Sequence, residues 1–195
     1  MLKQTTNLLT LSFLILTGCA APQRISHPLA SLQDQETVKS FNIPEGQARV
    51  YFFLGYLRMY DKKIQDMDTP TEIFINDKSL GIIGNKSEII AVDLYPRVYE
   101  FKWSSLEEKG AWWPNPTVLK VTLNEKSQTF LEAIILDTYS ATKDFLFGVV
   151  GALASSHTRF LAILEQNPQK GREAIFTKNL ISLNTQIKDS VKSME

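Results

Sequence analysis

Short apolar segments with alternating polarity dominate the chain from residue 47 onward. In residues 98–103, for example, Tyr99, Phe101 and Trp103 alternate with Val98, Glu100 and Lys102, which places the three aromatic rings on one face of a strand. Segments rich in β-branched and aromatic residues, separated by turn residues, predict eight strands, at residues 48–54, 72–75, 80–83, 88–94, 98–103, 117–123, 129–136 and 159–166. Many short strands indicate a sandwich or barrel rather than an α/β fold, and we expect a mainly β chain with an antiparallel β-sandwich.

The connections between these segments are predicted from their turn residues. Asn76 and Asp77 tolerate left-handed backbone and predict a tight hairpin turn in residues 76–79. Residues 55–71 are predicted to form a loop. Its acidic residues, Asp61, Asp66 and Asp68, lack the glycine and the terminal glutamate of an EF-hand, so a solvated loop is expected rather than a cation site.

The last part of the chain, residues 167–195, predicts a C-terminal α-helix. Asn167 is suited to the N-cap and Pro168 to the first helical position, and the helix should run to about residue 191, with Gly171 as a weak point. Apolar residues follow at steps of four and three and form one stripe: Phe176, Leu180, Leu183, Ile187, Val191 and Met194. Such a stripe packs on its own domain or contacts a partner helix as a coiled-coil seam, and the spacing allows both.

The N-terminus has the pattern of a secretory signal. Lys3 precedes an apolar run at residues 8–16 that is shorter than the ~20 residues needed to span a bilayer. Leu16-Thr17-Gly18-Cys19 resembles the bacterial lipobox, which implies cleavage before Cys19, a diacylglyceryl thioether on its sulfur and an added acyl chain such as palmitate. The alternative is an ordinary signal peptide with a chance cysteine.

These patterns divide the chain into four parts. We predict a signal peptide at residues 1–18, a lipidated tether without stable structure at 19–46, a sandwich domain at 47–166 and the helix at 167–195. Ala20 after the anchor implies sorting to the outer membrane in a two-membrane bacterium, with the domain in the periplasm. Removal of 18 residues leaves 177, which suits one domain and a tether.

Composition restricts the partners. Cys19 is the only cysteine, so its acylation leaves no thiol for a disulfide or a nucleophile. Without Lys3, 20 basic side chains face 21 acidic ones, and this balance argues against nucleic acid and against a polybasic lipid-binding patch.

Three segments carry a family resemblance: Ala-Arg-Val-Tyr-Phe-Phe at 48–53, Ile-Phe-Ile-Asn-Asp-Lys-Ser-Leu-Gly at 73–81 and Leu-Tyr-Pro-Arg-Val-Tyr-Glu-Phe at 94–101. They resemble an uncharacterised family of small bacterial envelope lipoproteins with a PEGA-like β-sandwich. The resemblance implies the fold and brings no catalytic residues. This chain has Lys78 and Arg97 where that family usually has glycine, which implies different turn types.

The chemistry-bearing residues form no catalytic motif. The two histidines, His27 and His157, are expected to be surface residues, and the sequence contains no Gly-x-Ser-x-Gly elbow, phosphate-binding loop or closely spaced metal ligands. No cofactor or metal is therefore expected. Trp112 and Trp113, on a proline-stiffened loop, either plug an open end of the sandwich or stack on a ligand. The apolar run at residues 145–154 is a core segment or an interface.

We therefore expect a non-enzymatic binding or assembly module that is attached to the membrane through acyl chains on Cys19 and contacts an envelope protein partner. Candidate contact residues are those of the tryptophan loop and the helical stripe: Trp112, Trp113, Phe176, Leu180, Leu183 and Ile187. The alternatives are a glycan-binding module that uses the tryptophan loop and an envelope hydrolase built on carboxylates such as Asp137 and Asp144.

Overall fold

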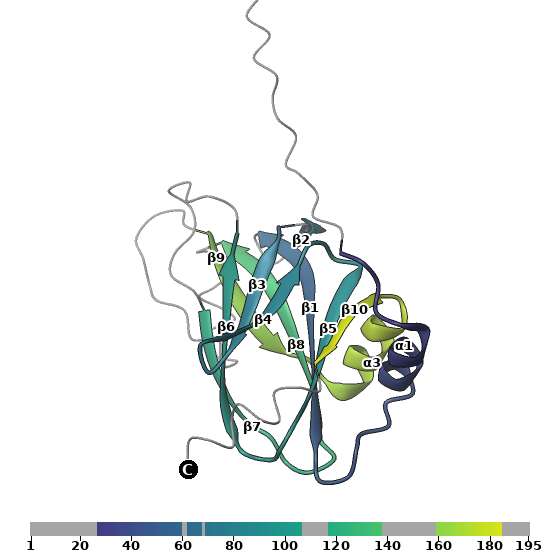
Figure 1. Cartoon of the computed structure of the whole chain (residues 1–195). Coiled ribbons are helices and arrows are strands. Elements are labelled where there is room, and N and C mark those ends of the chain that lie inside the picture. Colours follow the sequence, from purple (N-terminus) through teal and green to yellow (C-terminus); the bar gives the residue numbers. More distant parts are fainter. Residues whose placement is uncertain (1–26, 60–61, 68, 107–116, 138–158, 185–195) are drawn as a thin grey trace, which may run out of the picture.

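The computed structural model describes residues 27–59, 62–67, 69–106, 117–137 and 159–184. Within these ranges the chain forms two sheets and two helices (Figure 1). In chain order, the elements are α1 (Leu32–Lys39), β1 (Ala48–Met59), β2 (Lys62–Asp66), β3 (Thr71–Ile75), β4 (Lys78–Ile83), β5 (Glu88–Leu94), β6 (Val98–Ser105), β7 (Thr117–Thr122), β8 (Gln128–Asp137), β9 (Arg159–Glu165), α3 (Pro168–Phe176) and β10 (Asn179–Asn184). The predicted β-sandwich with a C-terminal helix is confirmed.

The two sheets differ in strand direction. The smaller sheet has the order β4-β3-β6-β7 and is antiparallel throughout. The larger sheet has the order β10-β5-β1-β8-β9, with β2 paired to β1, and contains two parallel pairs, β1 with β8 and β5 with β10. The expectation of antiparallel strands therefore fails at these two pairs. Both join strands distant in sequence, and parallel neighbours require such long crossover connections.

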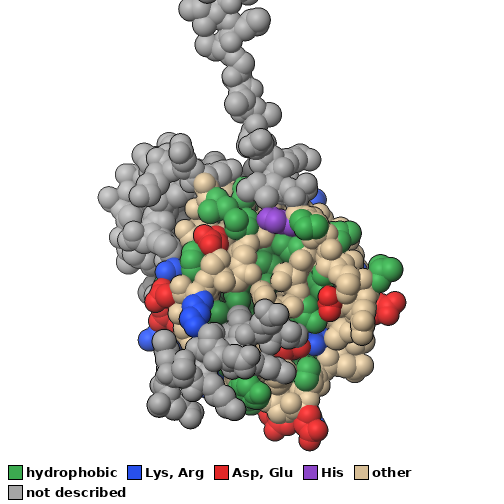
Figure 2. Space-filling model, viewed as in Figure 1, with side chains coloured by type: hydrophobic (Ala, Val, Ile, Leu, Met, Phe, Trp, Pro, Cys, Tyr) green, Lys and Arg blue, Asp and Glu red, His purple; other side chains and the backbone are tan. Residues whose placement is uncertain are grey.

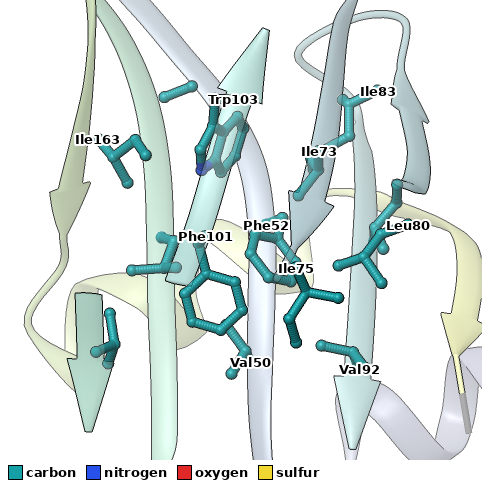
Figure 3. Packing of buried hydrophobic residues seen from close by; sticks show 14 of the residues in the cluster. Val50, Phe52, Ile73, Ile75, Leu80, Ile83, Val92, Phe101, Trp103 and Ile163 are labelled. Carbon is teal, nitrogen blue, oxygen red and sulfur yellow. The ribbon is translucent and has the colours of Figure 1, made fainter. Parts of the chain in front are cut away.

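The main core lies between the two sheets. Figure 3 shows Val50 and Phe52 of β1 facing Phe101 and Trp103 of β6. The ring centroid of Phe52 is 5.3 Å from that of Phe101 and 5.8 Å from that of Trp103. Tyr99, Phe101 and Trp103 are all buried, so the alternation in this segment correctly predicted its inward face.

A second core covers the opposite face of the larger sheet. There, α1 and α3 cover the sheet (Figure 1), and residues that alternate with those of the main core point toward them. The second core comprises Val38, Tyr51, Phe53, Ile89, Ala91, Phe130, Ile175 and Leu180. Because both faces of β1 and β5 are covered, these strands read as continuous apolar runs rather than as alternating ones.

The β3–β4 hairpin has the predicted tight turn. Asn76 and Asp77 have φ values of 45° and 63°, and Ile75 pairs with Lys78, which leaves a two-residue turn of type I′ character. Lys78 already belongs to β4. Neither Lys78 nor Arg97 has a positive φ, so these turns do not require glycine at either position.

Two predicted boundaries are wrong. In the predicted 55–71 loop, β1 continues to Met59 and pairs with β2 through residues such as Tyr56 and Asp66. At the C-terminus, the predicted helix ends at Phe176, and β10 follows it. The apolar spacing there fits a helix, but Leu180 is buried because β10 adds to the edge of the larger sheet beside β5.

Candidate attachment site

The segment that follows the proposed lipid anchor is attached to the larger sheet from His27 onward. The Glu88 carboxylate, at the start of β5, accepts hydrogen bonds from Gly84 N at 2.7 Å and Asn85 Nδ2 at 2.9 Å. The same carboxylate lies 3.4 Å from His27 N and 3.3 Å from His27 Nδ1. Three residues further on, Ala30 N donates to Leu180 O of β10 at 2.9 Å. We call the contact between His27 and Glu88 the His27 latch.

The segment then forms α1, where the sequence predicted a tether without stable structure. Ser31 caps the helix by accepting a hydrogen bond from Asp34 N at 3.1 Å. Val38 is the buried residue of this helix and joins the second core. Because only one residue of this helix is buried, the sequence shows no apolar stripe and the helix was not predicted. Its stabilising contacts come from the sheet surface beneath it.

A buried ion pair lies under α1. Arg49 of β1 and Asp93 of β5 face each other, with Nε 2.6 Å from Oδ1 and Nη2 2.9 Å from Oδ2. Their side chains are 0% and 2% exposed. Arg49 Nη1 also donates to Thr37 O of α1 at 2.9 Å, so one guanidinium joins two strands and the helix. Burial by itself lowers the pKa of Arg49, but the hydrogen bond and charge of Asp93 outweigh it and raise that pKa above its usual value.

Aromatic rings extend this attachment. Tyr51 stacks on Phe130 with centroids 4.7 Å apart and planes 6° apart, and its hydroxyl donates to Val38 O at 3.3 Å. Phe41 lies two residues after the end of α1. Its ring centroid is 5.8 Å from that of Tyr51, 6.4 Å from that of Phe130 and 5.3 Å from that of Phe176. Its φ of 58° is unusual for a bulky residue, and such strain persists only where packing holds it. Gln128 Nε2 also donates to Phe41 O at 2.9 Å.

The buried Tyr51 predicts a loss of stability in alkali. Burial, partly offset by Arg49, raises the pKa of Tyr51 to about 12, against 10.0 in the unfolded chain. Above pH 10 the unfolded state therefore releases a proton that the folded state keeps, and this contribution to stability falls as pH rises toward 12. We expect a loss of about 1.4 kcal/mol at pH 11 in urea unfolding. Tyr51→Phe should lack this loss, and parallel pH profiles for the two proteins would contradict it.

The predicted contact residues fall in different places. Leu180 is buried in the second core, Leu183 packs against it, and Phe176 is 59% exposed at the end of α3. These three residues therefore do not form a helical seam, because two of them lie on β10. Ile187, Cys19 and His157 lie outside the described residues.

The ends of the tryptophan loop are placed by the strands around it. Trp112 and Trp113 lie outside the described residues, as does the run at 145–154. Thr117, at the start of β7, donates through Oγ1 to Leu161 O of β9, which places the end of the tryptophan loop where β8 ends and β9 begins. The chain from His27 enters at the same end of the larger sheet, because β5 starts beside the later half of β1 (Figure 1).

Of the carboxylates proposed for catalysis or cation binding, the described ranges contain Asp66 and Asp137, each at the end of a strand. Asp137 ends β8 opposite Arg159, and Asp66 ends β2 in register with Tyr56. Asp61, Asp68 and Asp144 lie outside the described residues. Within the described ranges, no group of three or more histidine, cysteine, aspartate or glutamate side chains is suited to hold a metal ion.

Sequence reasoning overlooked the polar residues that hold the N-terminal segment. The available signal was a charge inside an apolar strand: Arg49 follows Ala48 in the first strand, and Asp93 precedes Leu94 in the fourth predicted one. A charged residue in a segment buried on both faces requires a partner.

Neither helix of the described structure is long and apolar enough to cross a membrane. The chain matches no protein-family model, and comparison with curated proteins finds no significant similarity.

Proposed function

We propose that this chain is a lipid-anchored, non-enzymatic protein of the bacterial envelope that binds or assembles with a protein partner close to the membrane that holds Cys19. The observation that carries the proposal is the attachment of residues 27–41 to the larger sheet. Seven residues separate Cys19 from His27, and this length of chain spans at most about 28 Å. The sequence predicted a tether that runs to residue 46, but the structure attaches the chain to the domain from His27 onward. The connection between Cys19 and the domain is therefore shorter than predicted.

The far end of the described domain supports the binding part of this proposal. There, the turn between β5 and β6 exposes Tyr95 (49%) and Val98 (58%). The Arg97 guanidinium lies 4.7 Å from the Tyr99 ring, and the Tyr99 hydroxyl donates to Tyr95 O at 3.1 Å, so the turn is held in place. Tyrosine and arginine are enriched at protein interfaces. Because β5 has seven residues, this turn lies about 20 Å from the His27 latch.

The test combines lipid analysis with site-specific crosslinking in cells. We expect the mature protein to begin at an acylated Cys19 and to fractionate with membranes. A photoreactive amino acid at position 95 should capture one protein in stoichiometric amount. The same group at Val118, exposed on the smaller sheet, should not capture it. Cys19→Ser should remove both the acylation and the capture.

Two results would contradict the proposal. An unmodified Cys19 in a protein that fractionates as soluble would exclude the lipid anchor. Equal capture from positions 95 and 118, or capture that persists in Cys19→Ser, would exclude a partner contact that depends on the far-end turn and on membrane attachment.

A further inference from the structure

The residues next to the His27 latch expose apolar side chains. Leu29 is 57% exposed and Leu32, the first residue of α1, is 80% exposed. Figure 2 shows the histidine, in purple, at the boundary of the described surface with hydrophobic side chains beside it. We call Leu29 and Leu32, with the backbone between them, the entry shoulder.

The entry shoulder is held in a fixed position on the domain. His27 is fixed by Glu88, and Ala30 by its hydrogen bond to Leu180 O. Gln35 Nε2 also donates back to Ala30 O at 3.2 Å, and this ties the start of α1 to the segment before it. These hydrogen bonds therefore hold the backbone on both sides of Leu29 in place.

The distance from the proposed anchor identifies the occupant of this surface. Nine residues separate Cys19 from Leu29, so this exposed leucine lies at most about 35 Å of extended chain from the acylated residue. Ser31 and Gln33, the polar residues beside the leucines, carry no charge. The Asp34 carboxylate, which accepts a hydrogen bond from Ser31 Oγ at 2.7 Å, adds one negative charge beside the entry shoulder. Exposed leucines with polar neighbours suit the headgroup layer of a phospholipid bilayer, where apolar side chains enter the boundary with the acyl chains.

We propose that the entry shoulder rests on the bilayer that holds the anchor, with Leu29 and Leu32 in the headgroup layer. This inference rests on the proposed lipid anchor and adds an orientation to it. With the entry shoulder on the membrane, β5 runs from the latch toward the far-end turn and carries Tyr95 and Val98 away from the lipid. A second contact beside the anchor restricts the rotation of the domain about its short connection.

Spin labelling tests the orientation directly. Acylation consumes the thiol of Cys19, so a cysteine introduced into the mature protein is its single free thiol. Leu29→Cys, Leu32→Cys and the far-end control Val98→Cys are purified in acylated form, labelled with a nitroxide and placed in vesicles of phosphatidylethanolamine and phosphatidylglycerol. Collision rates with oxygen and with a water-soluble nickel chelate then report the depth of each label.

We expect the labels at positions 29 and 32 to be shielded from the nickel chelate and accessible to oxygen, at depths of about 5–10 Å, and the label at 98 to remain aqueous. Aqueous labels at 29 and 32 in a protein whose mass shows acylated Cys19 would overturn the orientation and leave the anchor intact. Labels aqueous in vesicles but shielded in cells would also overturn it, because a protein would then cover the shoulder. An unacylated Cys19 would instead refute the proposed function.

Discussion

Asp93→Ala is expected to cost about 3–5 kcal/mol of the free energy of unfolding, because it leaves the Arg49 guanidinium buried without its carboxylate. Arg49 is 0% exposed, and two of its nitrogens donate to Asp93. The lost energy is mainly the cost of an uncompensated charge in a site that water does not reach. Urea unfolding monitored by circular dichroism measures the change.

Two comparisons separate burial from charge in that experiment. Lys120→Ala removes the partner of Glu100 in an exposed pair, where the nitrogen-to-oxygen distance is 3.8 Å, and should cost about 0–1 kcal/mol. Replacing both Arg49 and Asp93 by leucine should cost less than Asp93→Ala alone, since no charge is left buried. An Asp93→Ala variant as stable as Lys120→Ala would contradict the role given to the pair.

The same variant should also loosen the N-terminal segment. Arg49 Nη1 donates to Thr37 O, so a guanidinium displaced by the loss of Asp93 no longer holds α1 in its place. Hydrogen exchange at the α1 amides should then accelerate more than exchange in the smaller sheet. This consequence matters for function because α1 belongs to the short link between the anchor and the domain.

Gly171→Ala is expected to destabilise the protein by about 2–3 kcal/mol, although glycine-to-alanine changes inside helices usually stabilise by about 1 kcal/mol. A Cβ at Gly171 would lie 2.6 Å from both Cδ1 and Cδ2 of Phe130. Phe130 is 0% exposed and stacked on Tyr51, so its ring cannot move aside without disturbing the second core. The helix must shift outward instead.

The matched control for this change is Lys170→Ala, one residue earlier on the exposed side of α3. It should leave stability within about 0.5 kcal/mol. Adding Phe130→Leu to Gly171→Ala should recover part of the loss, and the coupling between the two sites is then measured by the double-mutant cycle. Stabilisation by Gly171→Ala, as helix propensity alone predicts, would show that α3 does not pack as closely as described.

The role of Gly171 in the structure differs from the role that its helix propensity predicts. The sequence predicts a weak point in the first turn of the helix at this position, because glycine has low helix propensity. In the structure it is the point of close approach between α3 and the larger sheet, since Phe130 occupies the space that a side chain would need. The contact joins two residues 41 positions apart, and no local pattern reveals it.

Local sequence patterns were enough to predict the inward-facing residues of β6 and the turn between β3 and β4. Tyr99, Phe101 and Trp103 alternate with Val98, Glu100 and Lys102 because one face of β6 is buried and the other is more exposed, and the local sequence shows this difference. Asn76 and Asp77 specified their turn because few residue types accept positive φ. In both cases the deciding energy is local to a few neighbouring residues.

The conformations of residues 32–39 and 179–184 depend on contacts with distant parts of the chain. Residues 32–39 show no apolar stripe, yet they form α1 because Arg49 and the second core hold them on the sheet. Leu180 and Leu183 have helical spacing, yet they lie on β10 because the edge of β5 offers hydrogen bonds and a buried position. These choices depend on partners far away in the chain, and a local pattern carries no information about a surface that exists only after folding.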